Sequence, residues 1–121
     1  MGQYSNAMND LLGIDIAPQT IYRSTGLLIH MIKRKHNNCT QYIDCIPDII
    51  CSPDFIGVNP NENGPSVEFV KRYDTNVLVG VKLDTYNNYL YVSTMYEVSE
   101  SKVKRRLHSG RLMEFVKCVD I

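Results

Sequence analysis

Long apolar stretches are missing from this sequence of 121 residues. Residues 24–36 read STGLLIHMIKRKH, and His30 interrupts their aliphatic run well before the roughly 20 apolar residues that a membrane-spanning helix needs. No apolar core follows a basic N-terminus, which argues against a secretory signal peptide. We therefore expect a cytoplasmic protein that has no contact with a membrane.

An excess of charge of one sign is also missing, because 13 basic residues balance 13 acidic ones. Proteins that coat nucleic acid non-specifically need a broad excess of Lys and Arg. The cations are nevertheless concentrated, since residues 33–36 read KRKH and residues 102–111 read KVKRRLHSGR without an acid. Charge segregated in this way predicts a local basic cleft.

Metal and cofactor motifs are absent as well. The four cysteines form no CxxC pair, and the spacing of Cys39, Cys45 and Cys51 is not that of zinc ligands. The sequence also lacks an HExxH motif, a P-loop and the glycine pattern of dinucleotide-binding folds. We interpret the cysteines as structural, and we expect no metal ion and no cofactor.

The length and composition predict one domain. The hydrophobic share of 44% and the charged share of 21% are typical of a globular chain with a single core. Residues 5–8 read SNAM, which is typical of a cleaved expression tag. We therefore interpret residues 1–7 as a tag remnant and residues 8–121 as the domain.

The N-terminal half predicts helices. Residues 24–36 carry an apolar stripe behind Ser24 or Thr25 as N-cap. A second helical segment at residues 40–50 contains Pro47, which kinks it or splits it into two short helices. Three further segments are expected: a helical turn at 8–13, an extended segment or short edge strand at 14–24, and a loop at 52–66.

The C-terminal half changes to the alternating period of strands. Residues 67–73, 76–84 and 88–98 predict three strands joined by tight turns, hence an antiparallel meander. A last helix follows at residues 99–110, and residues 111–119 add an edge strand or a short helix. The layout predicts an α+β fold with N-terminal helices packed on one face of an antiparallel sheet.

The first candidate site lies on the helix predicted near the N-terminus. Metal-free cleavage of RNA needs a base, an acid and fixed cations beside the phosphate. His30 and Arg34 are four residues apart and share a helix face, with Lys33 beside them. In the alternative interpretation His30 is buried and bonded to backbone, and the cations line a solvated edge. His36 then only complements the helix dipole.

A second group of candidates lies in the C-terminal half. Ser93 and Thr94 interrupt an apolar strand, although threonine is common in strands. One of Tyr89, Tyr91 and Tyr96 could stack a base, and packing within the sheet is the alternative. The last helix offers a basic wall that either contacts phosphate or is simply exposed, formed by Arg105, Arg106, His108 and Arg111.

Five segments together resemble one family. They read IYRSTGLLIHMIKRKH, YIDCIPDIICSPDFIGVNPNENG, NVLVGVKLD, YLYVSTMYEV and SKVKRRLHSGRL. Over residues 14–116 the chain resembles the phage- and prophage-associated nuclease domains grouped with barnase, EndoU, colicin and RelE toxins (BECR-like domains). The resemblance implies N-terminal helices followed by an antiparallel sheet of about four strands. It also implies metal-independent ribonuclease activity, often in a toxin.

The resemblance implies roles for particular residues. In the family pattern a histidine directly follows the arginine of an HxxKR element, whereas here Lys35 lies between Arg34 and His36. Either His30 or His36 is therefore the catalytic imidazole. The expected catalytic residues are His30, Arg34, His36 and Thr94. The expected RNA-binding residues are Lys33, Lys35, Tyr91, Ser93, Arg105, Arg106, Ser109 and Arg111.

The sequence thus predicts a metal-independent endoribonuclease, the toxin of a prophage or another mobile element. It is expected to cleave RNA by attack of the 2′-OH, leaving a 2′,3′-cyclic phosphate. Its expected partners are the RNA substrate and an antitoxin or immunity protein. The alternative is a non-catalytic phage effector that binds RNA or a protein.

Overall fold

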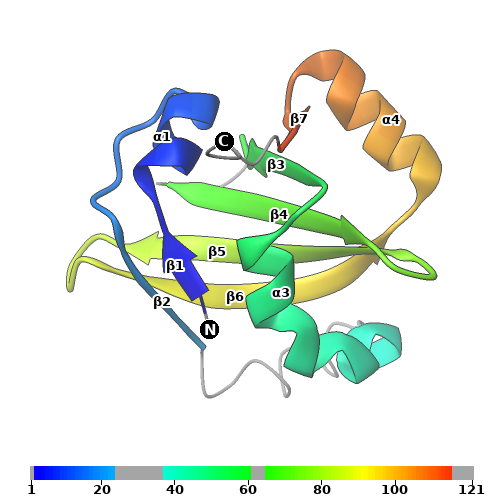
Figure 1. Ribbon diagram of the computed structural model, residues 1–121, viewed down its shortest axis with the longest axis horizontal. Helices are drawn as coiled ribbons and strands as arrows, with labels where there is room; N and C mark the ends of the chain where they lie inside the picture. The colour runs from blue at the N-terminus through cyan, green and yellow to red at the C-terminus, as the bar shows by residue number, and fades with distance from the viewer. Residues whose placement is uncertain (1, 24–36, 61–64, 116–121) are drawn as a thin grey trace, which may run out of the picture.

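The structure is a computed structural model that describes residues 2–23, 37–60 and 65–115 (Figure 1). The helix predicted at residues 24–36 lies outside the described residues. So do the candidate residues that it carries, namely His30, Lys33, Arg34, Lys35 and His36.

A seven-stranded sheet dominates the described part of the chain, in the order β1-β2-β6-β5-β4-β3-β7. Its strands are β1 (Gly2–Tyr4), β2 (Gln19–Arg23), β3 (Phe55–Val58), β4 (Ser66–Arg72), β5 (Asn76–Asp84), β6 (Tyr89–Val98) and β7 (Leu112–Glu114). Strand β2 runs parallel to β6, while the other neighbouring pairs are antiparallel. The sheet is therefore mixed, and it is curled (Figure 1).

The helices of the described residues are short. They are α1 (Asn6–Leu12), the 3-10 helix η1 (Asn37–Cys45), α3 (Ile46–Cys51) and α4 (Glu100–Ser109). Helix α3 and helix α1 contribute Ile46, Ile49, Ile50 and Met8 to the main core on one face of the sheet. Helix α4 packs Val103 and Leu107 against the opposite face.

The predicted fold class is wrong, because the sheet has seven strands of mixed direction rather than about four antiparallel ones. The helices of the described residues are also short, so the sheet and not a layer of helices dominates the fold. The strands that the sequence did not indicate are β1 and β3, which have three and four residues. The edge strand considered at residues 111–119 is present as β7, with three residues. A strand of that length is fixed by its hydrogen-bonded neighbours, and too few residues alternate for the sequence to indicate it.

The longer elements agree with the sequence. The meander is confirmed by β4, β5 and β6, whose antiparallel register is continuous apart from one irregularity beside Gly80. The last helix is confirmed as α4, where Ser99 accepts a hydrogen bond from the Lys102 amide and Gly110 ends the helix at φ 85°. Residues 40–50 divide into η1 and α3, with Pro47 in the first turn of α3.

The main core occupies one face of the sheet. Alternate residues of the central strands supply it, for example Phe69 of β4, Val79 of β5 and Met95 of β6, all fully buried. The residues between them point to the opposite face, which we call the second face. Helix α4 covers one part of the second face over Val70 and Leu78. The remaining part carries the polar groups described next.

Candidate functional site

A buried carboxylate marks the second face. Glu68 lies on β4 between Val67 and Phe69, which both face the main core, so alternation turns its side chain the other way. Glu68 is only 2% exposed. A charged group removed from water needs a close partner of opposite charge.

Arg111 supplies that partner. Its Nε lies 2.9 Å from Oε1 of Glu68, and its Nη2 lies 3.1 Å from Oε2, which is a bidentate pair. The hydrogen bond from Arg111 to Glu68 and the negative charge of that carboxylate raise the pKa of Arg111, although burial opposes the shift. The guanidinium therefore stays charged and its plane is fixed by Glu68.

Arg106 reaches the same carboxylate from the last turn of α4. Its Nη1 is 3.9 Å from Oε2 of Glu68, and its side chain is 17% exposed. Among the residues that the structure describes, Nη1 of Arg106 is the buried side-chain polar atom that has no hydrogen-bond partner. A guanidinium cannot shed its proton, so this buried N–H group favours an acceptor such as an anion.

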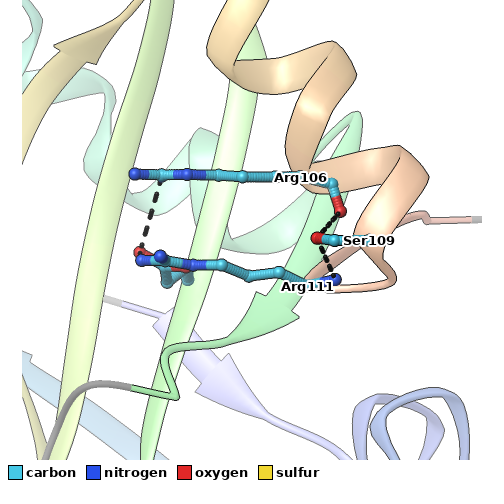
Figure 2. Close-up of polar contacts among 4 residues, drawn as sticks. Arg106, Ser109 and Arg111 are labelled. Carbon is cyan, nitrogen blue, oxygen red and sulfur yellow. Dashed lines mark hydrogen bonds and ion pairs between the residues drawn. The ribbon is translucent and has the colours of Figure 1, made fainter.

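Ser109 links the two arginines through their backbones. Its Oγ donates to the carbonyl of Arg106 at 3.1 Å and accepts from the amide of Arg111 at 3.4 Å. Figure 2 shows both arginines extending side by side from the end of α4, with Ser109 between their backbones. The hydroxyl that was expected to bind RNA is thus engaged in positioning the arginine pair.

Gly57 permits the close approach that brings Arg111 over Glu68. Strand β3 pairs with both β4 and β7, so that Gly57 is opposite Glu68 on one side and Leu112 on the other. A Cβ at residue 57 would lie 1.8 Å from the carbonyl oxygen of Arg111. Only glycine fits between the two backbones at this point.

Two of the predicted hydroxyl groups share this face. Gly80 is opposite Glu68 on β4 and opposite Thr94 on β6. Ser93 is the extra residue of a β-bulge, and its Oγ donates to the carbonyl of Gly80 at 3.2 Å. Thr94 lies two strands from Glu68, which places their backbones roughly 10 Å apart. The side chains of Ser93 and Thr94 are partly buried beside Gly80.

The other predicted residues have separate positions. Tyr91 lies on the second face, across from Lys82 of β5. Arg105 is exposed on α4, and His108 is exposed in its last turn. The structure therefore brings Arg106 and Arg111 together with Glu68, and it leaves Arg105 apart from them.

Glu68 was not among the predicted site residues. The available signal was a single acid within the apolar strand VEFV, in a chain whose segment 102–111 has cations and no acid to pair with them. Glu68 contacts Arg106 and Arg111, which are 38 and 43 residues further along the chain. A pairing over that distance could not be predicted from the residues next to Glu68.

A family model matches most of the chain. Residues 1–105 match phage-Barnase-EndoU-ColicinE5/D-RelE like nuclease3 (PBECR3). The chain belongs to this nuclease family. The resemblance found in the sequence is thereby confirmed, and a PBECR3 domain is a nuclease-like domain of phage type. Neither the curated proteins nor the solved structures gave a match.

The PBECR3 match covers β1 to β6 and ends within α4, so it includes Glu68, Ser93 and Thr94 but stops before Arg106. Within the described ranges, no group of three or more His, Cys, Asp or Glu side chains is arranged to hold a metal ion. No helix in those ranges is long and apolar enough to span a membrane.

Proposed function

We propose that this PBECR3 domain is an endoribonuclease that cleaves RNA by attack of the 2′-OH on the adjacent phosphate, without a metal ion. The observation that carries the proposal is the arginine pair on the second face. Glu68 fixes Arg111, and Arg106 retains a buried N–H group without an acceptor. Nη1 itself is enclosed, but the Arg106 side chain is 17% exposed, so a phosphate can contact the part of the side chain that faces solvent.

The arginine pair fits the charge that develops in this reaction. Attack by the 2′-oxygen adds negative charge to the phosphate, which becomes a five-coordinate phosphorane. Guanidinium groups held in place before the reaction stabilise that charge without reorganising. They also supply the positive charge that a metal ion supplies in other nucleases. Burial strengthens the interaction because water screens it less.

Proton transfer in this proposal belongs to one imidazole, that of His30 or His36. It takes the proton from the 2′-OH or donates a proton to the departing 5′-oxygen, and water carries out the other transfer. Arg34 stabilises the charge on the reacting phosphate, and Thr94 orients the reacting groups. Lys33 and Lys35 bind the flanking phosphates. The bond between the phosphate and the 5′-oxygen breaks, which leaves a 2′,3′-cyclic phosphate and a 5′-hydroxyl.

The arginine pair is tested with Arg106→Gln and Lys104→Gln. Both changes remove one positive charge from α4, but Lys104 is exposed and lies outside the contacts with Glu68. With an unstructured RNA in EDTA, we expect Arg106→Gln to lower the cleavage rate about 10²–10³-fold, the usual loss of one transition-state donor. Lys104→Gln should cleave at nearly the wild-type rate. Equal losses in both variants would contradict the proposed site.

We also propose that the nuclease acts as a toxin in the cell that produces it, held in check by an antitoxin or immunity protein. Membership of a phage nuclease family supports this role. Induction of the wild-type chain in bacteria should arrest growth, and induction of Arg106→Gln to the same level should not. Growth arrest by both proteins would favour a non-catalytic effector instead.

A further inference from the structure

Three tyrosines form a cluster on the second face, beyond the arginine pair. Tyr22 lies on β2, and Tyr89 and Tyr91 lie on β6, the strand that runs parallel to β2. Their neighbours Ile21 and Leu90 are fully buried in the main core, so alternation turns all three rings to the second face. We call Tyr22, Tyr89 and Tyr91 the tyrosine cluster.

The rings of the tyrosine cluster touch one another without stacking in parallel. The centroids of Tyr22 and Tyr89 are 6.3 Å apart with ring planes at 76°, and those of Tyr89 and Tyr91 are 5.7 Å apart with planes at 45°. Tyr22 is 56% exposed, and the other two are partly exposed. The large aromatic surface of Tyr22 is thus presented to solvent instead of being packed.

A second pair of tyrosines in this chain packs by parallel stacking. Tyr42 and Tyr73 stack with centroids 5.1 Å apart and planes at 22°, against the main core. Burial raises the pKa of Tyr73, and its hydroxyl donates to Asp48. Tyr42 and Tyr73 are partly buried, as Tyr89 and Tyr91 are, so the difference lies in Tyr22. Packing of the kind seen for Tyr42 and Tyr73 does not account for the 56% exposure of Tyr22.

The tyrosine cluster lies close to the arginine pair. Across the three central strands, Glu68, Gly80 and Thr94 lie side by side on the second face. The next set of paired residues on this face is Ser66, Lys82 and Tyr91. Two strand spacings across and two residues along give a separation of roughly 12 Å between the backbones of Tyr91 and Glu68. Nucleotides that flank a phosphate bound at Arg106 can reach that far.

We propose that the tyrosine cluster is a stacking subsite for unpaired bases, which makes single-stranded RNA the substrate class; this inference rests on the proposed function. Bases stack on tyrosine rings whatever their identity, because every base has a π-face. Lys82 lies across from Tyr91, so its positive charge would lie beside the sugar–phosphate backbone of the bound RNA. Asp84, at the start of the adjoining turn, accepts hydrogen bonds from the amides of Tyr86 and Asn87 and from Tyr89. Bases paired in a duplex cannot reach the rings.

Binding of an oligonucleotide that cannot be cleaved tests the subsite. The ligand is a fluorescent single-stranded RNA with 2′-O-methyl groups throughout, measured by anisotropy with the full chain. Tyr22→Leu and Tyr91→Leu keep an apolar side chain but remove the ring. Each should weaken binding about 5- to 150-fold, the range of one lost stacking interaction. Tyr22→Phe and Tyr91→Phe should bind like wild type.

Two controls make the binding experiment decisive. Tyr86 is 94% exposed in the turn between β5 and β6, outside the cluster, so Tyr86→Leu should not change binding. The same oligonucleotide annealed to its complement should bind more weakly than the single strand, and the leucine changes should not weaken it further. Leucine variants that bind the single strand like wild type, or a duplex that binds equally well, would overturn the subsite.

Cleavage of the unmodified RNA, measured in parallel, separates this inference from the proposed function. A chain that shows the tyrosine dependence but does not cleave would refute the nuclease mechanism alone. A chain that cleaves with full activity after Tyr22→Leu and Tyr91→Leu would refute the subsite alone.

Discussion

Replacing Glu68 with glutamine should destabilise the protein strongly although the side chain keeps its size. Glutamine removes the charge that pairs with Arg111 at 2.9 and 3.1 Å and faces Arg106 at 3.9 Å. Both arginine side chains are less than a fifth exposed, at 18% and 17%. Breaking a buried ion pair by removing one partner typically costs about 3–5 kcal/mol.

The expected loss is large relative to the whole stability of such a domain, about 5–15 kcal/mol. Urea unfolding followed by circular dichroism measures it. With a slope of about 2 kcal/mol per molar urea, the midpoint should fall by about 1.5–2.5 M in Glu68→Gln. The variants Arg111→Gln and Glu68→Gln/Arg111→Gln complete a cycle that should show coupling of about 0.5–3 kcal/mol.

Glu100→Gln is the matched control. Glu100 pairs with Arg72 at 2.8 Å, but both side chains are nearly half exposed, at 48% and 47%. Exposed pairs contribute at most about 1 kcal/mol. If Glu68→Gln lowers the midpoint no more than Glu100→Gln does, Glu68 does not hold the arginines in place.

Four further substitutions test other parts of the structure and of the mechanism. Gly57→Ala should lower the free energy of unfolding by about 1–3 kcal/mol and reduce cleavage, because the alanine Cβ would lie 1.8 Å from the carbonyl oxygen of Arg111. A melting temperature equal to that of the wild type would contradict the close approach of the two backbones. Burial raises the pKa of Tyr4 to about 12 from 10, so the stability that this shift contributes is complete below pH 10 and is lost as pH rises through 12. Between pH 9 and 11 the wild type should therefore lose roughly 1 kcal/mol more stability than Tyr4→Phe, and equal losses would argue against a buried phenol. His30→Ala should slow RNA cleavage about 10²–10⁴-fold without unfolding the chain, and Thr94→Ala should have a smaller effect; full activity of His30→Ala would rule out its catalytic role.

The parts of the fold that the sequence predicted are those with a strong local pattern. Strands β4, β5 and β6 have seven to ten residues, enough for the alternation to be visible. Helix α4 has a capping serine and a terminating glycine. Strand β3, by contrast, lies in a segment rich in proline and glycine that predicts a loop. The parallel pairing of β2 with β6 joins residues about 70 apart, such as Ile21 and Leu90, and leaves no local trace.

The residues of the candidate site also differ in whether the local sequence indicates them. Arg106 and Arg111 were predicted because they belong to a run of cations that is visible in the sequence. Glu68 was missed because its role depends on the fold, which places it in contact with the two arginines. Arg105 has the same sequence signal as Arg106 but lies exposed on the helix. The imidazoles His30 and His36 stay predictions, as does the assignment of residues 1–7 to a tag.

The most direct test of the central claim is to map the ends produced from a single-stranded RNA by the purified chain in EDTA. Attack by the 2′-OH predicts 2′,3′-cyclic phosphates and 5′-hydroxyls, formed at the same rate with and without the chelator, and no cleavage when deoxyribose replaces ribose at the scissile position. Products with 5′-phosphates, or cleavage only when magnesium is present, would contradict the mechanism.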